Sequence, residues 1–322
     1  MSRYKVTREG ALLEYLLELF PHQSRTSVKN MLAKGQVTVN GASQTAFDLP
    51  LRQGDRLEIL PKGVSIARAT RNEAREEVEK AGVQILFEDE HYLVAEKPSG
   101  MLCVSTARGS QAKSGHKEKT LYAILNAYVK VNACMQRKED LITGKEPDRS
   151  TAKVWIVHRL DKGTSGAVIF AKDERAKDLL QSKWKELVLE RKYVAWLEGV
   201  VEKDSGAIQS WMVENPKSLK MYSFRDEVKD GQLAITHYRV IQRTKHYSQV
   251  EFELETGRKN QIRVHAADLG HPVAGDEKYG AQTDPIRRLA LHAATLVFRN
   301  PYTQKKVRCS SPLPSSFERF VK

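Results

Sequence analysis

The sequence has 322 residues, of which 40% are hydrophobic, so the chain can bury a substantial core and is not a disordered polymer. Lys and Arg outnumber Asp and Glu by 53 to 40, and the net charge of +13 favours a polyanionic partner, with nucleic acid as the first expectation. A basic surface that serves only solubility is the alternative.

The cysteines and the apolar segments narrow the cellular setting. Cys103, Cys134 and Cys309 are odd in number and far apart, so the sequence offers neither a disulfide framework nor a CxxC metal site. No apolar run approaches the roughly 20 residues that cross a bilayer, and the first ten residues lack the apolar stretch of a signal peptide. We therefore expect a cytoplasmic protein that does not bind membranes.

Residues 1–62 have the pattern of a small domain. Apolar residues repeat at helical spacing from Leu12 to Phe20, and Pro21 ends that helix. A second helix is expected over residues 24–33. Two strands follow, in QVTVNG (36–41) and in RLEIL (56–60), each beside a turn that contains glycine. The pattern predicts two helices and a hairpin-like sheet.

The middle of the chain changes character twice. Residues 63–82 are dense in both charges and poor in large apolar side chains, which predicts a partly helical, solvated linker. A second domain is expected over residues 83–322, where strand-like runs begin. Two polar stretches, 103–119 and 136–153, predict long loops that could lie beside a bound polyanion.

The rest of the chain predicts more strands than helices. Strands are expected in AVIFAK (167–172), KYVAWLEGV (192–200), AITHYRVIQ (234–242) and QVEFELE (249–255), and helices over 174–190 and 260–270. Strands and helices do not alternate strictly. We therefore expect an α+β domain with a central mixed, mainly antiparallel sheet flanked by helices and loops.

The stretch VHRLDKGTSG (157–166) places Asp161 after a strand-like run and before a turn with two hydroxyls and two glycines. An aspartate at such a junction can act as a nucleophile or a general base. The alternative is a structural aspartate that accepts backbone N–H groups and pairs with Arg159. The stretch alone favours the structural interpretation.

Two further segments bear on Asp161. In LETGRKNQIRVH (254–265), Arg263 lies beside the apolar face of a short helix, so it needs an anion, and Asp161 is a candidate partner. A surface arginine that covers apolar side chains is the alternative. Tyr193 begins a strand and is either core filling or a surface on which a base could stack.

Motifs for metals, phosphates and acyl transfer are missing from the sequence. It has no HExxH, no GxxxxGK[ST], no GxGxxG after a strand and no GxSxG. We therefore expect a reaction without metal or cofactor, centred on a carboxylate within a basic protein.

HRLDKGTSG (158–166), RKYVAWLEG (191–199) and LETGRKNQIRVH (254–265) resemble, in order and spacing, three motifs of the RluA-type family of RNA pseudouridine synthases. EDEHYLVAEKPSGM (88–101), AGDEKYG (274–280) and LALHAATLVF (289–298) resemble further family segments, so the resemblance covers roughly residues 83–320. It implies that residues 83–322 isomerise uridine in folded RNA to pseudouridine without cofactor or metal. One position departs from the pattern, because Asn260 stands where many members have histidine.

The resemblance also implies roles for individual residues. Asp161 matches the essential aspartate, which either attacks the ribose or takes part in removing a proton from it. Tyr193 matches the tyrosine that stacks on the base and helps to remove the C5 proton, and Arg263 matches the arginine paired with the aspartate. Arg159 matches the arginine that holds the target nucleotide out of its helix, and we expect His158 and Thr164 beside it in the substrate-binding site.

Residues 1–62 are similar to S4 RNA-binding domains. In this unit Arg25, Lys29 and Lys34 fall on or just after the second helix, away from its apolar face, and we expect them to bind RNA phosphates. A solvated helix face is the alternative. The prediction is a monomeric pseudouridine synthase with ribosomal RNA as the preferred substrate, and the alternatives are transfer RNA or a non-catalytic RNA-binding factor in ribosome assembly.

Overall fold

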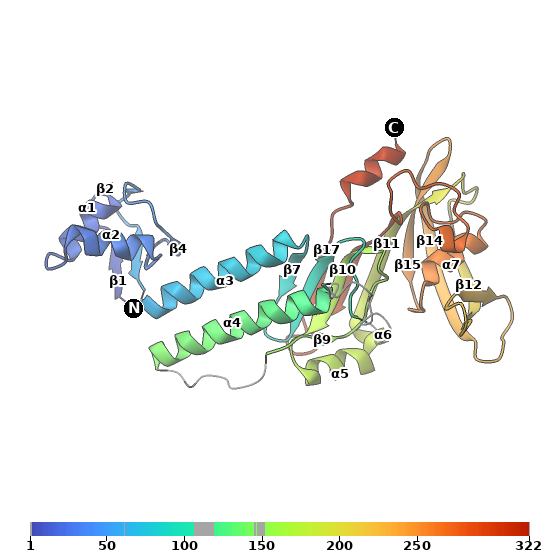
Figure 1. Ribbon diagram of the computed structural model, residues 1–322, viewed down its shortest axis with the longest axis horizontal. Coiled ribbons are helices and arrows are strands. Elements are labelled where there is room, and N and C mark those ends of the chain that lie inside the picture. The colour runs from blue at the N-terminus through green and yellow to red at the C-terminus, as the bar shows by residue number, and fades with distance from the viewer. Residues whose placement is uncertain (1, 61, 106–118, 145, 147–151, 322) are drawn as a thin grey trace, which may run out of the picture. The chain divides into compact units, whose positions relative to one another are not determined.

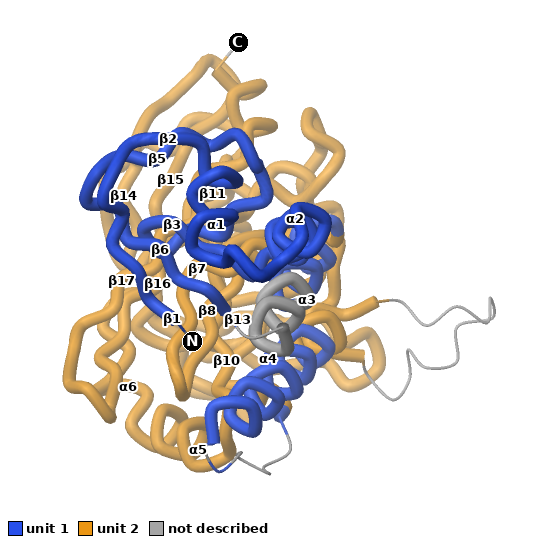
Figure 2. Tube along the Cα trace, turned by 90° about the vertical axis from the view of Figure 1, so that its left-hand side faces the viewer, with its two compact units in different colours: residues 1–80, 126–152 blue, residues 81–125, 153–322 orange. Residues whose placement is uncertain are grey.

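The computed structural model describes residues 2–60, 62–105, 119–144, 146 and 152–321. The chain forms two compact units, coloured separately in Figure 2: residues 1–80 with 126–152, and residues 81–125 with 153–322. Within the described ranges no helix is both long and apolar enough to span a membrane.

The first unit begins with a small sheet and two helices. Its strands are β1 (Ser2–Lys5), β2 (Gly10–Ala11), β3 (Val37–Val39), β4 (Ala42–Ser43), β5 (Pro50–Leu51) and β6 (Arg56–Ile59), and its first helices are α1 (Leu12–Leu19) and α2 (Arg25–Ala33). The order β1-β6-β3-β4 is antiparallel throughout.

Local chemistry explains where these elements begin and end. The Ser24 hydroxyl accepts the Ser27 backbone N–H at 3.1 Å, which caps the start of α2. Asn40 and Gly41 both have positive φ (51° and 85°), as the two-residue turn between β3 and β4 requires. Leu16 and Leu32 are buried in the core between helices and sheet. The predicted two helices and hairpin-like sheet are confirmed.

Two long helices follow, one within the first unit and one that begins in the second unit and enters the first at residue 126. Helix α3 (Lys62–Lys80) covers most of the predicted linker, and α4 (Leu121–Thr143) shows that the expected loop over 136–153 was wrong as far as residue 143. The helices run side by side (Figure 1), and Arg71 Nη1 lies 3.0 Å from Glu139 Oε1. The predicted domain boundaries at residues 62 and 82 remain a prediction. Residues 106–118, in the other expected loop, lie outside the described residues.

The second unit is built on an eleven-stranded sheet. Its strands are β7 (Gln84–Glu88), β8 (Tyr92–Lys97), β9 (Trp155–Ile156), β10 (Ser165–Ala171), β11 (Val188–Glu198), β12 (Ser205–Glu214), β13 (Met221–Phe224), β14 (Gln232–Arg243), β15 (Tyr247–Leu254), β16 (Leu291–Arg299) and β17 (Lys306–Ser310). Its helices are α5 (Glu174–Ser182), α6 (Trp184–Leu187) and α7 (Gln261–Asp268), with 3₁₀ segments η2 (Glu277–Tyr279) and η3 (Ser315–Phe320).

The strands follow the order β13-β12-β14-β15-β11-β16-β10-β8-β7, with β17 paired to β16 and β9 to β10. Among the described strands β10 and β16 form a parallel pair, and the other pairs are antiparallel, so the predicted mixed, mainly antiparallel sheet is confirmed. The helix expected over 174–190 is shorter, because Val188 already pairs with Phe298 as the first residue of β11.

A glycine permits the close parallel contact between β10 and β16. Gly166 has φ +112°, and a Cβ built there would lie 2.2 Å from the carbonyl oxygen of Ala293 on β16. Only a residue without a side chain fits this approach. β10 therefore starts directly against β16, and the loop that carries Asp161 leads into this contact.

Candidate active site

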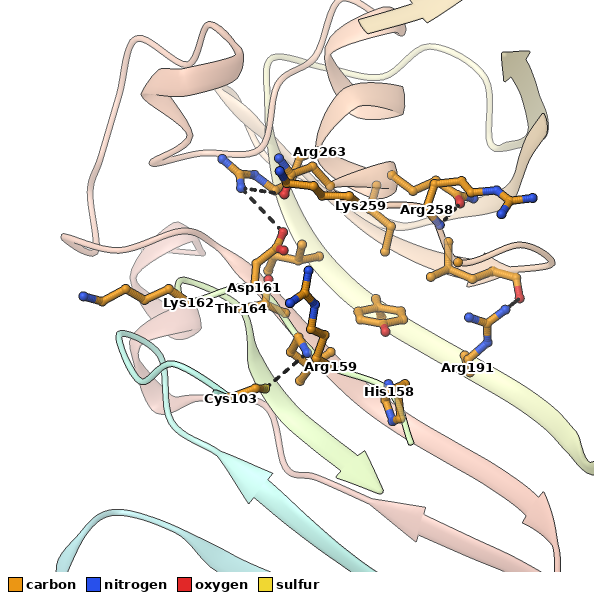
Figure 3. A pocket seen from close by; sticks show the side chains of 18 of the residues that line it. Cys103, His158, Arg159, Asp161, Lys162, Thr164, Arg191, Arg258, Lys259 and Arg263 are labelled. Atoms are coloured by element: carbon orange, nitrogen blue, oxygen red, sulfur yellow. Dashed lines mark hydrogen bonds and ion pairs between the residues drawn. The ribbon is translucent and has the colours of Figure 1, made fainter. Parts of the chain in front are cut away.

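A cavity of about 480 Å³ lies where the loop before β10 meets the segment between β15 and α7 (Figure 3). Its lining comes from residues within 102–104, 158–164 and 254–263, together with Arg191, Tyr193 and Leu291. Among these residues Asp161 is the one acid, and the bases are Arg159, Lys162, Arg191, Arg258, Lys259 and Arg263. The cavity can therefore hold a small polar group that belongs to a larger anion.

Asp161 lies in the loop between β9 and β10. Its backbone carbonyl accepts the Thr164 N–H at 3.1 Å, which closes the turn of the motif. Its carboxylate is one-third exposed and points into the cavity, where Oδ2 lies 3.5 Å from Nη1 of Arg263 (Figure 3). The carboxylate is thus oriented by the protein yet open to a ligand.

A buried lysine holds the backbone of this loop in place through hydrogen bonds. Lys97, at the end of β8, has no exposed surface, and its ammonium donates to the carbonyls of Pro98 (2.9 Å), Met101 (2.8 Å) and Lys162 (3.1 Å). The Ser99 hydroxyl adds a bond to the Gly163 carbonyl at 2.7 Å. Burial lowers the pKa of Lys97 to about 8. These bonds fix the backbone carbonyls of Lys162 and Gly163, which follow Asp161 in the turn.

Arg263 projects from the first turn of α7 and is held chiefly by a residue that the sequence analysis did not identify. Its Nε and Nη2 donate to the two carboxylate oxygens of Asp276 at 2.6 and 2.7 Å, and Asp276 is almost fully buried. The predicted pair with Asp161 is present but longer. Because the fork of the guanidinium is occupied by Asp276, only its Nη1 edge faces Asp161.

Asn260 completes the support of Arg263. It has φ +55°, a left-handed conformation that asparagine tolerates, just before α7. Its side-chain oxygen accepts from Arg263 Nη1 at 3.2 Å, and its amide donates to the Tyr279 hydroxyl at 2.9 Å. Asn260, which departs from the family pattern, therefore links α7 to the η2 segment within the protein.

Tyr193 forms part of the cavity wall from β11. Its ring is largely buried, and no described residue hydrogen-bonds to its hydroxyl. Burial raises the pKa of this phenol, so it is protonated at neutral pH. Next to it, Arg191 donates to the carbonyls of Leu254, Glu255 and Thr256 at 3.0 to 3.3 Å and so fixes the loop that carries Arg258.

The remaining sequence-predicted residues of the site have different surroundings. His158 accepts the Ile169 backbone N–H at 3.2 Å, and burial lowers its pKa to about 3, so the ring is neutral and supports β10. Arg159 is exposed at the cavity, and no described residue forms an ion pair with it. Thr164 is buried in the cavity wall.

Arg25, Lys29 and Lys34 belong to the first unit. All three are exposed. Arg25 pairs with Glu14 at 3.0 Å, and the Lys29 ammonium lies 5.1 Å from the centre of the Phe47 ring. They form an exposed basic group at α2 of the first unit.

The sequence analysis did not identify Lys97 or Asp276 as part of the site, although both lie in segments that carry the family resemblance, EKPSG and AGDEKYG. Neither touches the cavity: one acts on backbone carbonyls and the other on an arginine. Within the described residues, no cluster of three or more His, Cys, Asp or Glu side chains is arranged to hold a metal.

Comparisons with known proteins agree with this arrangement. A family model described as RNA pseudouridylate synthase matches residues 91–268. An uncharacterized RNA pseudouridine synthase of Bacillus subtilis is 32% identical over 304 residues, which cover 92% of this chain and 88% of the relative. Ribosomal large subunit pseudouridine synthase D of Xanthomonas campestris is 30% identical over 320 residues, 95% of this chain and 86% of the relative.

The protein of the same name from Pseudomonas aeruginosa is 30% identical over 316 residues, covering 93% of this chain and 87% of the relative. Among solved structures, human RNA pseudouridylate synthase domain containing 4 has a TM-score of 0.55 at 22% identity, covering 79% of this chain and 97% of that chain. This structure supports the fold of the second unit.

Replacing Asp276 should expose the cost of an unpaired buried arginine. We expect Asp276→Asn to lower the free energy of unfolding by about 3–5 kcal/mol, because Arg263 loses its bidentate partner. Combined with Arg263→Gln, the loss should fall short of the sum of the single losses by about 1 kcal/mol or more. Urea unfolding measures all three variants, with the exposed Asp226→Asn as control. Strictly additive losses would contradict the pairing.

The buried ammonium of Lys97 should give the stability a specific pH dependence. Its folded pKa of about 8 lies below the ordinary 10.5, so between these values the unfolded state binds a proton that the folded state does not. The free energy of unfolding of the native protein relative to Lys97→Met should therefore rise with pH, by about 1.4 kcal/mol per unit. The exposed Lys245→Met is the control for the loss of a lysine. A difference for Lys97→Met that stays flat from pH 8 to 10.5 would disprove this.

Proposed function

Because the chain belongs to the RNA pseudouridylate synthase family, we propose that it converts specific uridines of large-subunit ribosomal RNA into pseudouridine. The protein is an RNA pseudouridine synthase of the RluA type, an isomerase, and RNA is its substrate. The ribosomal target is supported by relatives that are named for the large ribosomal subunit and match almost the whole chain.

One observation carries the assignment of the site: Asp161 is the one carboxylate of a cavity whose other charged lining residues are basic. In the reaction the bond from the ribose C1′ to N1 of the base breaks, a bond from C1′ to C5 forms, and the proton on C5 leaves while N1 gains one. We propose that Asp161 acts on the ribose, either as nucleophile at C1′ or in removing a ribose proton. Arg263 keeps it aimed at the sugar.

We assign to Tyr193 the stacking of the detached base. Its protonated phenol and its buried ring suit a neutral aromatic surface better than a resting general base. To accept the C5 proton it would have to release its own proton in the same step. Arg159, exposed and unpaired within the described residues, is placed to contact the RNA from which the uridine has been extruded, which offsets part of the cost of unstacking.

The first unit is proposed to be an S4-like RNA-binding domain. Two helices packed on a small antiparallel sheet, with Arg25, Lys29 and Lys34 exposed at α2, present a surface suited to phosphates. The cytoplasmic location and the monomeric state remain predictions.

Tritium release tests the substrate directly. RNA labelled at uridine C5 and isolated from a host lacking the gene should release label with the native protein when the RNA is large-subunit ribosomal RNA. Asp161→Asn should reduce the rate by about 10³-fold or more, because the group that acts on the ribose is lost, whereas Asp226→Asn should not. Release of label from transfer RNA alone would show that transfer RNA, and not ribosomal RNA, is the substrate. Release by Asp161→Asn at the native rate would refute the assignment of Asp161.

The basic group at α2 should contribute to affinity through phosphates. We expect the triple variant Arg25→Gln, Lys29→Gln and Lys34→Gln to bind ribosomal RNA more weakly and to reduce the slope of log affinity against log salt by roughly 1 per lost phosphate contact. The matched control replaces Lys5, Arg52 and Arg56, exposed bases outside α2, by Gln. Equal effects in both triple variants would show that total charge alone matters.

A further inference from the structure

Three cations surround one aromatic ring beside the cavity. The ring is that of Tyr279, at the end of η2. The guanidinium carbon of Arg263 lies 4.9 Å from its centre, the ammonium of Lys220 lies 5.3 Å away and that of Lys278 lies 5.8 Å away. Because Tyr279 also hydrogen-bonds to Asn260, which lines the cavity, this group adjoins the cavity wall.

The positive charges of this region are only partly balanced by the protein. Asp276 neutralises Arg263, and Glu214 neutralises the nearby Lys259 through an ion pair. For Lys220 and Lys278, by contrast, no carboxylate in the described part of the chain lies within 4.0 Å of the ammonium. Two positive charges are thus held in excess beside the site.

The two lysines lie on neighbouring segments, Lys278 in η2 and Lys220 in the connection between β12 and β13. Lys278 donates one hydrogen bond to the Leu219 carbonyl at 2.9 Å, which leaves two of its three N–H groups free. Leu219 lies in the tight β12–β13 connection, with φ +53°, and its N–H donates to the Asn215 carbonyl at 2.8 Å. Lys220 follows directly in the chain. The connection therefore positions the Leu219 carbonyl for the Lys278 ammonium and places Lys220 next to that carbonyl in the chain.

Holding these charges together is unfavourable without an anion. Partial burial and the neighbouring charges of Arg263 and Lys259 lower the pKa of Lys278. The carboxylates of Asp161 and Asp276 offset only part of this electrostatic cost. A bound anion would remove that cost and raise the pKa again.

We propose that Lys220 and Lys278 form a binding site for a backbone phosphate of the RNA next to the target uridine. The proposal rests on the function above, in which the uridine enters the cavity with its ribose at Asp161. Arg159 and Arg263 lie on different sides of Asp161 (Figure 3), and the guanidinium of Arg263 contacts the Tyr279 ring that the two lysines share. In this proposal the strand that continues past Arg263 from the sugar at Asp161 meets these two lysines. An ammonium suits a phosphate as a point charge.

The test measures RNA binding by lysine variants. Transcripts of large-subunit ribosomal RNA and of transfer RNA are used in parallel, and every protein carries Asp161→Asn so that no turnover occurs. The relevant RNA is the one from which the native protein releases tritium. Lys278→Gln and Lys220→Gln should each weaken binding of this RNA roughly fivefold, and the double variant should weaken it roughly twentyfold. Each should lower the slope of log affinity against log salt by about 1. Lys245→Gln, in the turn at the opposite end of β15, is the charge-matched control and should change neither.

Two further measurements separate contact from structure. Lys278→Arg keeps the charge and should retain most of the salt slope, and in the active protein Lys278→Gln should raise KM more than it lowers kcat, because the lysine touches the backbone and not the reacting atoms. Unchanged affinity and slope in the double variant would overturn the proposal, as would an equal loss in Lys245→Gln. If label comes from transfer RNA, the ribosomal target fails while the phosphate site is tested on that RNA.

Discussion

The ion pair between Arg263 and Asp276 is the interaction on which the site depends. A buried guanidinium without a partner is costly, so α7 can present Arg263 to the cavity only because η2 brings a buried carboxylate against its other edge. The pair also removes most of the freedom of the arginine. What reaches Asp161 is a single N–H edge in a fixed direction, which orients the carboxylate without binding it tightly enough to block a sugar.

A second device positions the same carboxylate through the backbone. Lys97 donates its three N–H groups to carbonyls of two loops that are distant in sequence. It can do so because it is buried, where water does not compete for these groups. Asp161 is therefore positioned in two independent ways, by the side chain of Arg263 and by the hydrogen bond of Lys97 to the carbonyl of Lys162. Lys97 and Asp276 do not line the cavity, so both are positioning groups.

Much of the fold followed from local patterns, whereas the supports of the site did not. Periodicity predicted α1, α2 and the mixed sheet, and the apolar face of α7 predicted that Arg263 would need an anion. Val188 was misplaced because its apolar side chain suits either a helix or a strand, and its pairing with Phe298 comes from far along the chain. Asp276 was missed for the same reason: a carboxylate 13 residues from its arginine has no local pattern that marks the contact.

The charges near the cavity fall into two classes that do different work. Arg263 and Lys259 are balanced by Asp276 and Glu214, so they add little net potential and serve to hold geometry. Arg159 has no ion-pair partner in the described part of the chain and remains available to an incoming polyanion. An enzyme that must bind an RNA strand beside its catalytic carboxylate benefits from this separation, because the paired interior charges hold Asp161 in place while the unpaired Arg159 attracts the RNA.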